Sequence, residues 1–565
     1  MAPRRDRRSV DRVAQSAIFS ETVARLSEAS FLNWSPYSVD DPISLGTNFT
    51  AIDWVIVGVY LAVCVAAGLY VRRFVATMGD YVVAGRSLNS FLSIATMLGS
   101  EIGLVTVVYA AQKGFTGGFA AFYIGSLGGI LCLVVGLTGL FVVPLRRMGV
   151  MTIPEFYERR FGRGVRIFGG IILALTGILN MGMFLRAGAI FLTGLTGLTD
   201  PVTVKVVMTV LLLLVMSYTV LGGMLSVVVT DYIQFVVLAV GMVATCCFAL
   251  SRVGWSTLVD AVKTVHGDRG FDPVLGFGWG EIAQNALIVG LVSTAVWPTA
   301  LMRACSARDV TVVRRLYIWS SIGFLTRWII PQFLGVCALA YFWNDPRAHN
   351  LFFDADGRLF DDAEHANRTL QAMPLFLSQL LPAGLIGLLL AGMLAAQMST
   401  DSSYLLCWSS VLVEDVVNPM VGEHLSDRAR IGLARFFMVL IGAFLLVWSL
   451  WYPLGQHLWD YLAVTGAIYF TGAIALLAGG LYWRGASRCG AYLALASGLL
   501  AVFALGDVRK AAGLEWLTEP QILLGTTAIA LGLMIVGSLA WPDSDRRDPG
   551  RTAQASSESH RESLS

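Results

Sequence analysis

One face of a predicted apolar helix at residues 383–412 gathers oxygen atoms suited to a cation. At about 100° per residue, four positions share that face and a fifth lies at its edge. They are Ala396, Ser399, Thr400 and Ser403, with Ser402 at the edge. Hydroxyl and carbonyl oxygens are hard neutral ligands that suit a monovalent cation such as sodium, whereas calcium sites usually recruit carboxylates. The same hydroxyls could instead bond to the carbonyl four residues earlier or join two helices.

An acidic residue occupies the middle of a second apolar stretch, at residues 91–111. Glu101 is flanked by Gly99 and Gly103, and two glycines allow the helix to unwind at this point. Unwound backbone at membrane depth is tolerated where it is buried or lines a water-filled cavity, so this segment predicts a binding site. Close helix packing would explain the glycines alone, but it leaves Glu101 without a role.

Two arginines lie inside further apolar stretches. Arg327 is near the middle of residues 317–342, and Arg186 lies within residues 167–192. An ionisable residue within a membrane span is a functional candidate by default. The alternatives are that each side chain extends to the membrane surface or forms a structural ion pair, for example Arg327 with Glu101.

The composition explains why these polar residues stand out. Hydrophobic residues make up 56% of the 565 residues and charged residues only 14%, against roughly 25% charged in soluble proteins. A formal net charge of +2 gives no reason to expect nucleic acid as a partner. The eight cysteines and six histidines show no metal-ligand spacing, and no catalytic signature is present. We therefore expect an integral membrane protein that is not an enzyme.

Apolar stretches of about 17–25 residues predict about thirteen transmembrane helices. They are residues 54–71, 91–111, 119–143, 167–192, 204–220, 227–250, 282–301, 317–342, 383–412, 431–450, 462–483, 489–505 and 522–540. The loops richest in arginine, among them 146–163 and 308–315, fall on one side, which predicts an extracytoplasmic N-terminus and a cytoplasmic C-terminus. Residues 1–53 are predicted to be an extracytoplasmic tail and lead-in, 344–372 an extracellular insertion, and 542–565 a disordered cytoplasmic tail.

Four motifs follow one another along the predicted spans. They are DYVVAGRSL at residues 80–88, TIPEFYERRFG at 152–162, the segment 222–234 that runs from GGM to TDYIQ, and AAQMST at 395–400. In this order they resemble the sodium:solute symporter family, which includes the bacterial sodium-galactose, sodium-proline and sodium-sialic acid carriers. The resemblance covers residues 54–541. It implies an all-α membrane protein with a LeuT-type core of inverted five-helix repeats, at about 89–250 and 278–484, and transport by alternating access.

The resemblance also implies the ligands of a main sodium site. These are the backbone oxygens of Ala95, Leu98 and Ala396 and the side-chain oxygens of Ser399 and Thr400. By the same resemblance, Asp231 with Ser402 and Ser403 forms a second sodium site, which predicts two sodium ions for each solute. The alternative is that Asp231 caps a helix end after the glycine turn.

For the solute, the resemblance implies contacts from both repeats. Arg327 matches a substrate-contacting lysine of the galactose carrier, and Arg186 resembles the arginine that holds the carboxylate in the sialic acid carrier. Ile102 stands where the galactose carrier has a sugar-binding glutamine, which argues against hexose. With Glu101 and Ser293 these residues form the predicted solute site.

We therefore expect sodium-coupled uptake of a small organic solute, with membrane lipid as the other partner, in a bacterial inner membrane. Two arginines favour a sugar acid or organic acid that bears a carboxylate. The alternatives are sodium-coupled transport of a neutral sugar, amino acid or vitamin, a proton-coupled permease using Glu101 or Asp231, and a membrane sensor that keeps the symporter fold.

Overall fold

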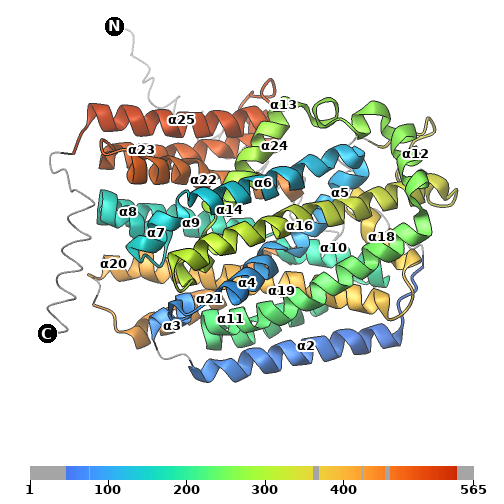
Figure 1. Ribbon diagram of the computed structural model, residues 1–565, viewed down its shortest axis with the longest axis horizontal. Coiled ribbons are helices and arrows are strands. Elements are labelled where there is room, and N and C mark those ends of the chain that lie inside the picture. Colours follow the sequence, from blue (N-terminus) through green and yellow to red (C-terminus); the bar gives the residue numbers. More distant parts are fainter. Residues whose placement is uncertain (1–45, 75–76, 361–367, 423, 452–457, 544–565) are drawn as a thin grey trace, which may run out of the picture.

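The computed structural model describes residues 46–74, 77–360, 368–422, 424–451 and 458–543, and its regular structure is helical throughout (Figure 1). Two isolated β-bridges are the exceptions within these residues. The predicted tails lie outside the described residues up to residue 45 and from residue 544. The lead-in at residues 46–50 precedes the first helix.

Every predicted span falls on helical structure. The helices that carry them include α2 (Ala51–Val71), α6 (Tyr123–Thr138), α9 (Arg163–Met181), α10 (Phe184–Thr196), α16 (Val310–Asn344), α19 (Leu385–Val411), α21 (Asp427–Trp451), α22 (Leu458–Tyr482), α23 (Arg488–Ser497) and α25 (Glu519–Ala540). Among the described residues, ten helical stretches are long and apolar enough to cross a membrane. This number is smaller than the predicted thirteen partly because two predicted spans form one long helix, α11 (Pro201–Val253). The total of thirteen crossings therefore stays a prediction.

A glycine bends α11 between its two predicted spans. Gly223 has φ +51° and ψ −144°, a conformation that side chains with a Cβ rarely adopt. A Cβ here would also lie 2.5 Å from the carbonyl oxygen of Tyr81, on α3 (Met78–Val83). The bend therefore requires glycine, and it sets the direction of the half-helix that carries Asp231.

Two spans are broken, and the break beside Glu101 is the one that Gly99 and Gly103 predict. The first break separates α4 (Ser90–Glu101) from α5 (Leu104–Gly117), leaving Ile102 and Gly103 outside both helices. The second break follows α13 (Pro273–Asn285), the π-helix η5 (Ala286–Val292) and α14 (Ser293–Ala295). The chain resumes as α15 (Pro298–Ser306), with Pro298 at the first position, where its missing N–H costs nothing. Each break exposes backbone groups at the ends of two half-helices.

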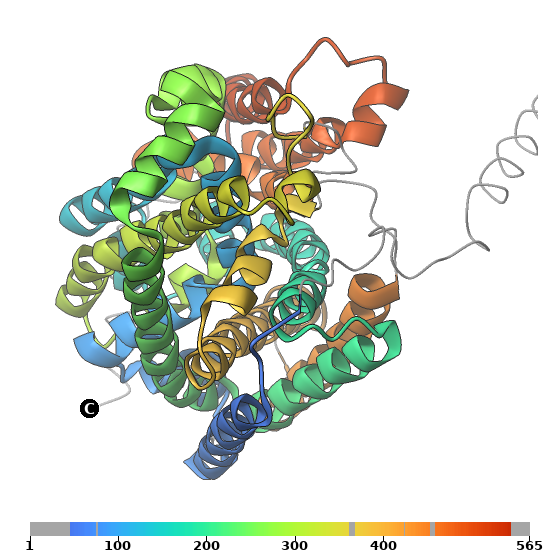
Figure 2. The ribbon, with the colours of Figure 1, turned by 90° about the vertical axis from the view of Figure 1, so that its right-hand side faces the viewer.

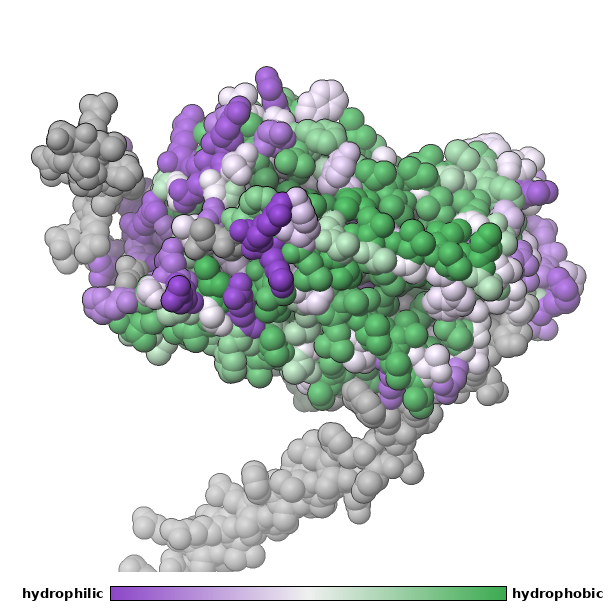
Figure 3. Space-filling view, turned by 90° about the horizontal axis from the view of Figure 1, so that it is seen from below, coloured by the Kyte–Doolittle hydropathy of each residue, from purple (hydrophilic) through white to green (hydrophobic). Residues whose placement is uncertain are grey.

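The loops separate into two groups at opposite ends of the helices (Figure 1). α3, α7 (Val142–Met148) and α8 (Ile153–Phe161) lie at one end, and α12 (Trp255–His266) and α18 (Ala372–Leu380) at the other. In the end-on view of Figure 2, α2 lies at the edge opposite the C-terminal helices. The face in Figure 3 is broadly hydrophobic over its middle, with hydrophilic residues toward its two ends, as a membrane-spanning surface requires.

Main-chain hydrogen bonds join the half-helices α4 and α15 where the arginine-rich loops gather. The amide N–H of Leu88 donates to the carbonyl of Ser306 at 3.3 Å, and the N–H of Arg308 donates to the carbonyl of Leu88 at 3.0 Å. The Arg146 Nε on α7 donates to the carbonyl of Ala307 at 2.8 Å. The start of α4 and the end of α15 are thus held side by side.

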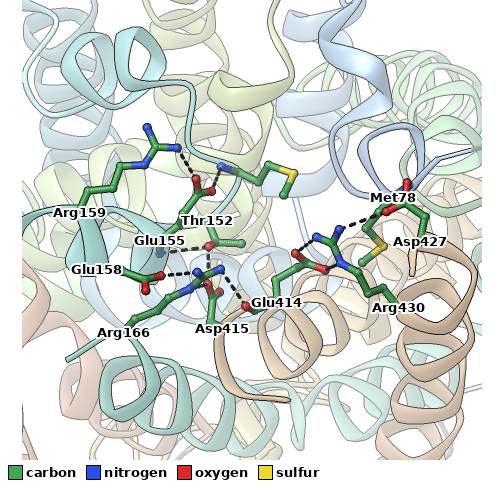
Figure 4. A network of polar contacts seen from close by, with 11 residues as sticks. Met78, Thr152, Glu155, Glu158, Arg159, Arg166, Glu414, Asp415, Asp427 and Arg430 are labelled. Carbon is green, nitrogen blue, oxygen red and sulfur yellow. Dashed lines mark hydrogen bonds and ion pairs between the residues drawn. The ribbon is translucent and has the colours of Figure 1, made fainter. Parts of the chain in front are cut away.

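Buried ion pairs close this same end of the bundle (Figure 4). The Arg166 guanidinium on α9 donates to the carboxylate of Asp415 at 3.0 Å and also pairs with Glu158. Asp415 accepts a further hydrogen bond from the Thr152 hydroxyl at 2.8 Å. A second cluster lies beside the first, where Arg430 on α21 pairs with Glu414. Glu414 and Asp415 belong to the π-helix η7 (Leu412–Val417) that ends α19, so the network joins α8, α9, α19 and α21.

Candidate functional site

A central cavity of about 120 Å³ lies where the two broken spans meet α9, α10, α16, α19 and α22. Its polar lining comprises Ser100, Glu101, Thr106, Asn180, Ser293, Arg327 and Thr400. Its aromatic lining comprises Phe184, Trp297, Trp328, Tyr404 and Phe470. Aromatic faces around a few convergent polar groups are typical of a small-molecule site.

An ion pair forms the charged part of the cavity. The Arg327 Nη1 atom lies 3.1 Å from a Glu101 carboxylate oxygen and 3.1 Å from the Glu101 carbonyl oxygen. The Arg327 Nη2 atom donates to the Ser293 hydroxyl at 3.1 Å, and the guanidinium lies 4.1 Å from the centre of the Phe324 ring. The second Glu101 oxygen accepts a hydrogen bond from the Thr299 hydroxyl at 3.1 Å. The alternative of a pair between Arg327 and Glu101 is therefore the observed arrangement.

Aromatic residues that contact one another form another part of the cavity lining. The Trp297 Nε1–H donates to the Tyr404 hydroxyl at 2.8 Å. The Trp297 ring also packs edge-on against Phe470, with ring centres 4.8 Å apart. Phe184 packs against Tyr404 at 4.9 Å. Because Trp297 lies in the second break, the unwound segment positions an aromatic ring at the cavity.

Two predicted solute residues lie elsewhere. Arg186 on α10 is not among the residues that line the central cavity, and its backbone N–H donates to the Ser449 hydroxyl at 3.1 Å. Ile102 instead lines a larger crevice of about 740 Å³ between α4, α11 and α16. That crevice is lined mainly by apolar side chains, and Ser90, Arg315, Thr326 and Arg327 also line it. The structure thus brings Glu101, Ser293 and Arg327 together and leaves Arg186 and Ile102 outside the cavity.

The predicted main sodium ligands lie on two helices, α4 and α19, that face each other. The Thr400 hydroxyl oxygen lies 3.4 Å from the Ser100 carbonyl across this interface, and the hydroxyl donates to the Ala396 carbonyl at 2.9 Å. Gly103 is needed for this approach, because a Cβ there would lie 2.9 Å from the Thr400 hydroxyl. The predicted set, Ala95, Leu98, Ala396, Ser399 and Thr400, supplies neutral hard oxygens, which fits a monovalent cation. No group of three or more His, Cys, Asp or Glu side chains in the described part of the chain could hold a metal ion.

A buried carboxylate adjoins this face. Asp231 on α11 is fully buried and accepts hydrogen bonds from the Ser399 and Thr96 hydroxyls, both at 2.5 Å. The Arg303 guanidinium lies 3.4 Å from the same carboxylate. Asp231 thus bonds to side chains from three other helices rather than capping a helix end.

Three contributors to these contacts escape the sequence prediction. Thr96 is an ordinary threonine in an apolar span, and Thr299 is the second residue of α15, directly after the second break. Arg303 falls two residues beyond the predicted end of its span at residue 301, so it is not counted as a charge within the membrane. The signal that could reveal it is Pro298, which starts a new helix and extends the span to Ser306.

Two broken helices that meet at a central cavity with polar and aromatic lining are typical of secondary transporters. The chain belongs to the sodium:solute symporter family, whose pattern matches residues 81–498. It is therefore a multi-pass membrane transporter, not an enzyme, and it couples movement of a small-molecule solute to sodium.

Relatives with assigned activities share about a quarter of its residues. Sodium/glucose cotransporter 4 of Danio rerio is 26% identical, over 81% of this chain and 72% of that protein. A sodium/glucose cotransporter of Vibrio parahaemolyticus is 24% identical, over 81% of this chain and 85% of that protein. A putative sodium-dependent multivitamin transporter of Drosophila melanogaster is 25% identical, over 70% of this chain and 64% of that protein.

A solved structure establishes the fold. A Na+-coupled sialic acid symporter in a substrate-bound outward-open state superposes with a TM-score of 0.72 at 19% identity, covering 88% of this chain and all of that one. The LeuT-type fold expected from the motifs is therefore confirmed.

Proposed function

We propose that this protein carries a neutral polyhydroxy solute, such as a sugar or a cyclic polyol, into the cell together with sodium. The observation that carries the proposal is the pairing of Arg327 with Glu101 at 3.1 Å. Because the two charges cancel and the remaining polar lining is neutral, the cavity has no net charge to attract a carboxylate. This departs from the expectation of a sugar acid or organic acid, which assumes two arginines in the cavity.

Both members of the pair suit hydroxyl groups. A carboxylate accepts hydrogen bonds from sugar hydroxyls and a guanidinium donates to them, while aromatic faces such as Trp297 and Phe470 pack against the apolar faces of a sugar ring. The sodium/glucose cotransporters among the relatives support this class of solute. The exclusion of hexose on the basis of Ile102 loses its force, because Ile102 does not line the cavity.

We further propose that Ala95, Leu98, Ala396, Ser399 and Thr400 bind the sodium ion. Ser100 and Thr400 line the solute cavity and also lie in the interface between α4 and α19. Occupation of the cation site would hold these two helices together and so fix one wall of the cavity, which gives sodium a direct way to promote solute binding. The arginine-rich end would face the cytoplasm of a bacterial inner membrane.

Uptake into proteoliposomes tests this proposal. The full-length protein would be given labelled neutral sugars, polyols, sugar acids, amino acids and vitamins, each with an inward sodium or potassium gradient. We expect accumulation of a neutral sugar or polyol with sodium alone. Accumulation of carboxylates only would contradict the solute class, and sodium-independent or absent uptake of every compound would favour the permease or sensor alternatives.

The Arg327→Gln variant tests the role of the pair in solute binding. It should abolish uptake of the accepted solute, because the donor to the solute and the partner of Glu101 are both lost. Arg315→Gln is the matched control, since Arg315 is exposed on the same helix α16 and should leave uptake unchanged.

A further inference from the structure

The predicted second sodium site contains a positive charge that belongs to the protein. The Arg303 Nη2 atom lies 2.5 Å from the Ser403 hydroxyl oxygen and 3.4 Å from the Asp231 carboxylate. Ser403 and Asp231 are two of the three residues expected to bind the second ion. The third, Ser402, donates its hydroxyl to the Ser399 carbonyl at 3.0 Å. The guanidinium therefore uses the oxygens that a second cation would need.

The helix α15 fixes the position of this guanidinium. The Arg303 Nη1 atom donates to the Thr299 carbonyl one turn earlier at 3.0 Å, and the residue is only 1% exposed. The Thr299 hydroxyl in turn contacts Glu101. Main-chain bonds at Ala307 and Arg308 anchor the far end of the same short helix. The positive charge of Arg303 thus lies on a helix that hydrogen bonds hold in place at both ends.

The charges already present at this site disfavour the binding of a second sodium ion. Asp231 and Arg303 are both buried and together carry no net charge. A sodium ion added between Asp231 and Ser403 would lie about 4 Å from the guanidinium. At an effective dielectric constant of about 20, the repulsion between these two positive charges would weaken sodium binding by roughly a thousandfold. A second carboxylate would be needed to offset this repulsion, and the side chains that bond to Asp231, namely Arg303, Thr96 and Ser399, do not supply one.

We propose that Arg303 occupies the second cation site as a permanent internal cation, so that the protein binds a single sodium ion at the main site. This inference rests on the proposed sodium site formed by α4 and α19. It replaces the expectation of two sodium ions for each solute. Arg303 is then the residue that sets the number of ions moved in each transport cycle.

Equilibrium binding of radioactive sodium to the purified full-length protein tests the inference without knowledge of the solute. We expect one ion per protein in the wild type and one in Arg303→Lys, which keeps the charge. Arg303→Gln should bind two, because it frees Asp231 and Ser403, and Arg303→Gln combined with Ser403→Ala should return to one. Gel-filtration profiles would establish that each variant is folded.

The outcomes separate this inference from the proposed function. Two ions bound by the wild type would overturn the role of Arg303 while leaving sodium coupling intact. One ion bound by a folded Arg303→Gln would equally overturn it. No sodium bound by the wild type would contradict the proposed sodium site and this inference with it.

Discussion

Substitution of Glu101 and Arg327, the two charged residues of the central cavity, should reveal a strong energetic coupling between them. Removal of one partner of a buried ion pair costs about 3–5 kcal/mol. The stability lost in Glu101→Gln should lie near the lower end of this range. The backbone carbonyl of residue 101 still accepts from Arg327, and the Thr299 hydroxyl can still bond to the new amide. Arg327→Gln should fall near the upper end, because it leaves Glu101 with Thr299 alone and removes the contact with the Phe324 ring.

The double variant decides whether the two residues act as a pair. Residues in direct contact show coupling energies of about 0.5–3 kcal/mol, so Glu101→Gln with Arg327→Gln should lose about 5 kcal/mol rather than the sum of about 8 kcal/mol. The measurement is the free energy of unfolding in mixed micelles by denaturant titration, without any solute. Arg315→Gln should change it by less than about 0.5 kcal/mol. A double variant that loses the full sum would refute the pairing and, with it, the argument for a neutral cavity.

Three further expectations can be checked with the same material. Ser399→Ala should weaken sodium activation of uptake at least tenfold by removing a ligand, while Ser410→Ala, on the same helix and also buried, should not; equal sodium dependence in both would place the site elsewhere. A cysteine at the exposed Asp356 should react with an impermeant reagent outside intact cells, and reaction only from the cytoplasm would reverse the proposed orientation. Arg166→Gln should lower the free energy of unfolding by about 3–5 kcal/mol, whereas Arg159→Gln, in a more exposed pair with Glu155, should lower it by less than about 1 kcal/mol.

The breaks in the two spans are predictable because their causes are local. Gly99 and Gly103 allow the first helix to end beside Glu101, and Pro298 forces a new helix to begin in the second. The oxygen-bearing face of α19 is predictable for the same reason, since helix periodicity alone places Ser399 and Thr400 together.

Contacts between distant segments are not predictable in this way. Arg166 and Asp415 are 249 residues apart in the chain, and Arg303 and Ser403 are 100 apart. A sequence read residue by residue gives each of these as a separate charge or hydroxyl. Only the packing of α9 against η7, and of α15 against α19, brings each pair within bonding distance.

The resemblance also sets a limit of its own. It places Arg186 and Ile102 at the solute because relatives have ligands at those positions. The direction of each side chain depends on the turn of α10 and on the backbone between α4 and α5. Here that geometry places Ile102 in the crevice between α4, α11 and α16 and leaves Arg186 beside α21.

The main-chain bridge between Leu88 and Ala307 bears on how such a transporter can diversify. It joins the half-helix that carries part of the proposed cation site with the half-helix that begins beside the central cavity, through backbone groups that every amino acid except proline possesses. Substitutions in the cavity can therefore alter which solute is accepted without cutting the connection between α4 and α15. Related transporters can therefore differ in the solute that they accept while they keep the same backbone connection between these two half-helices.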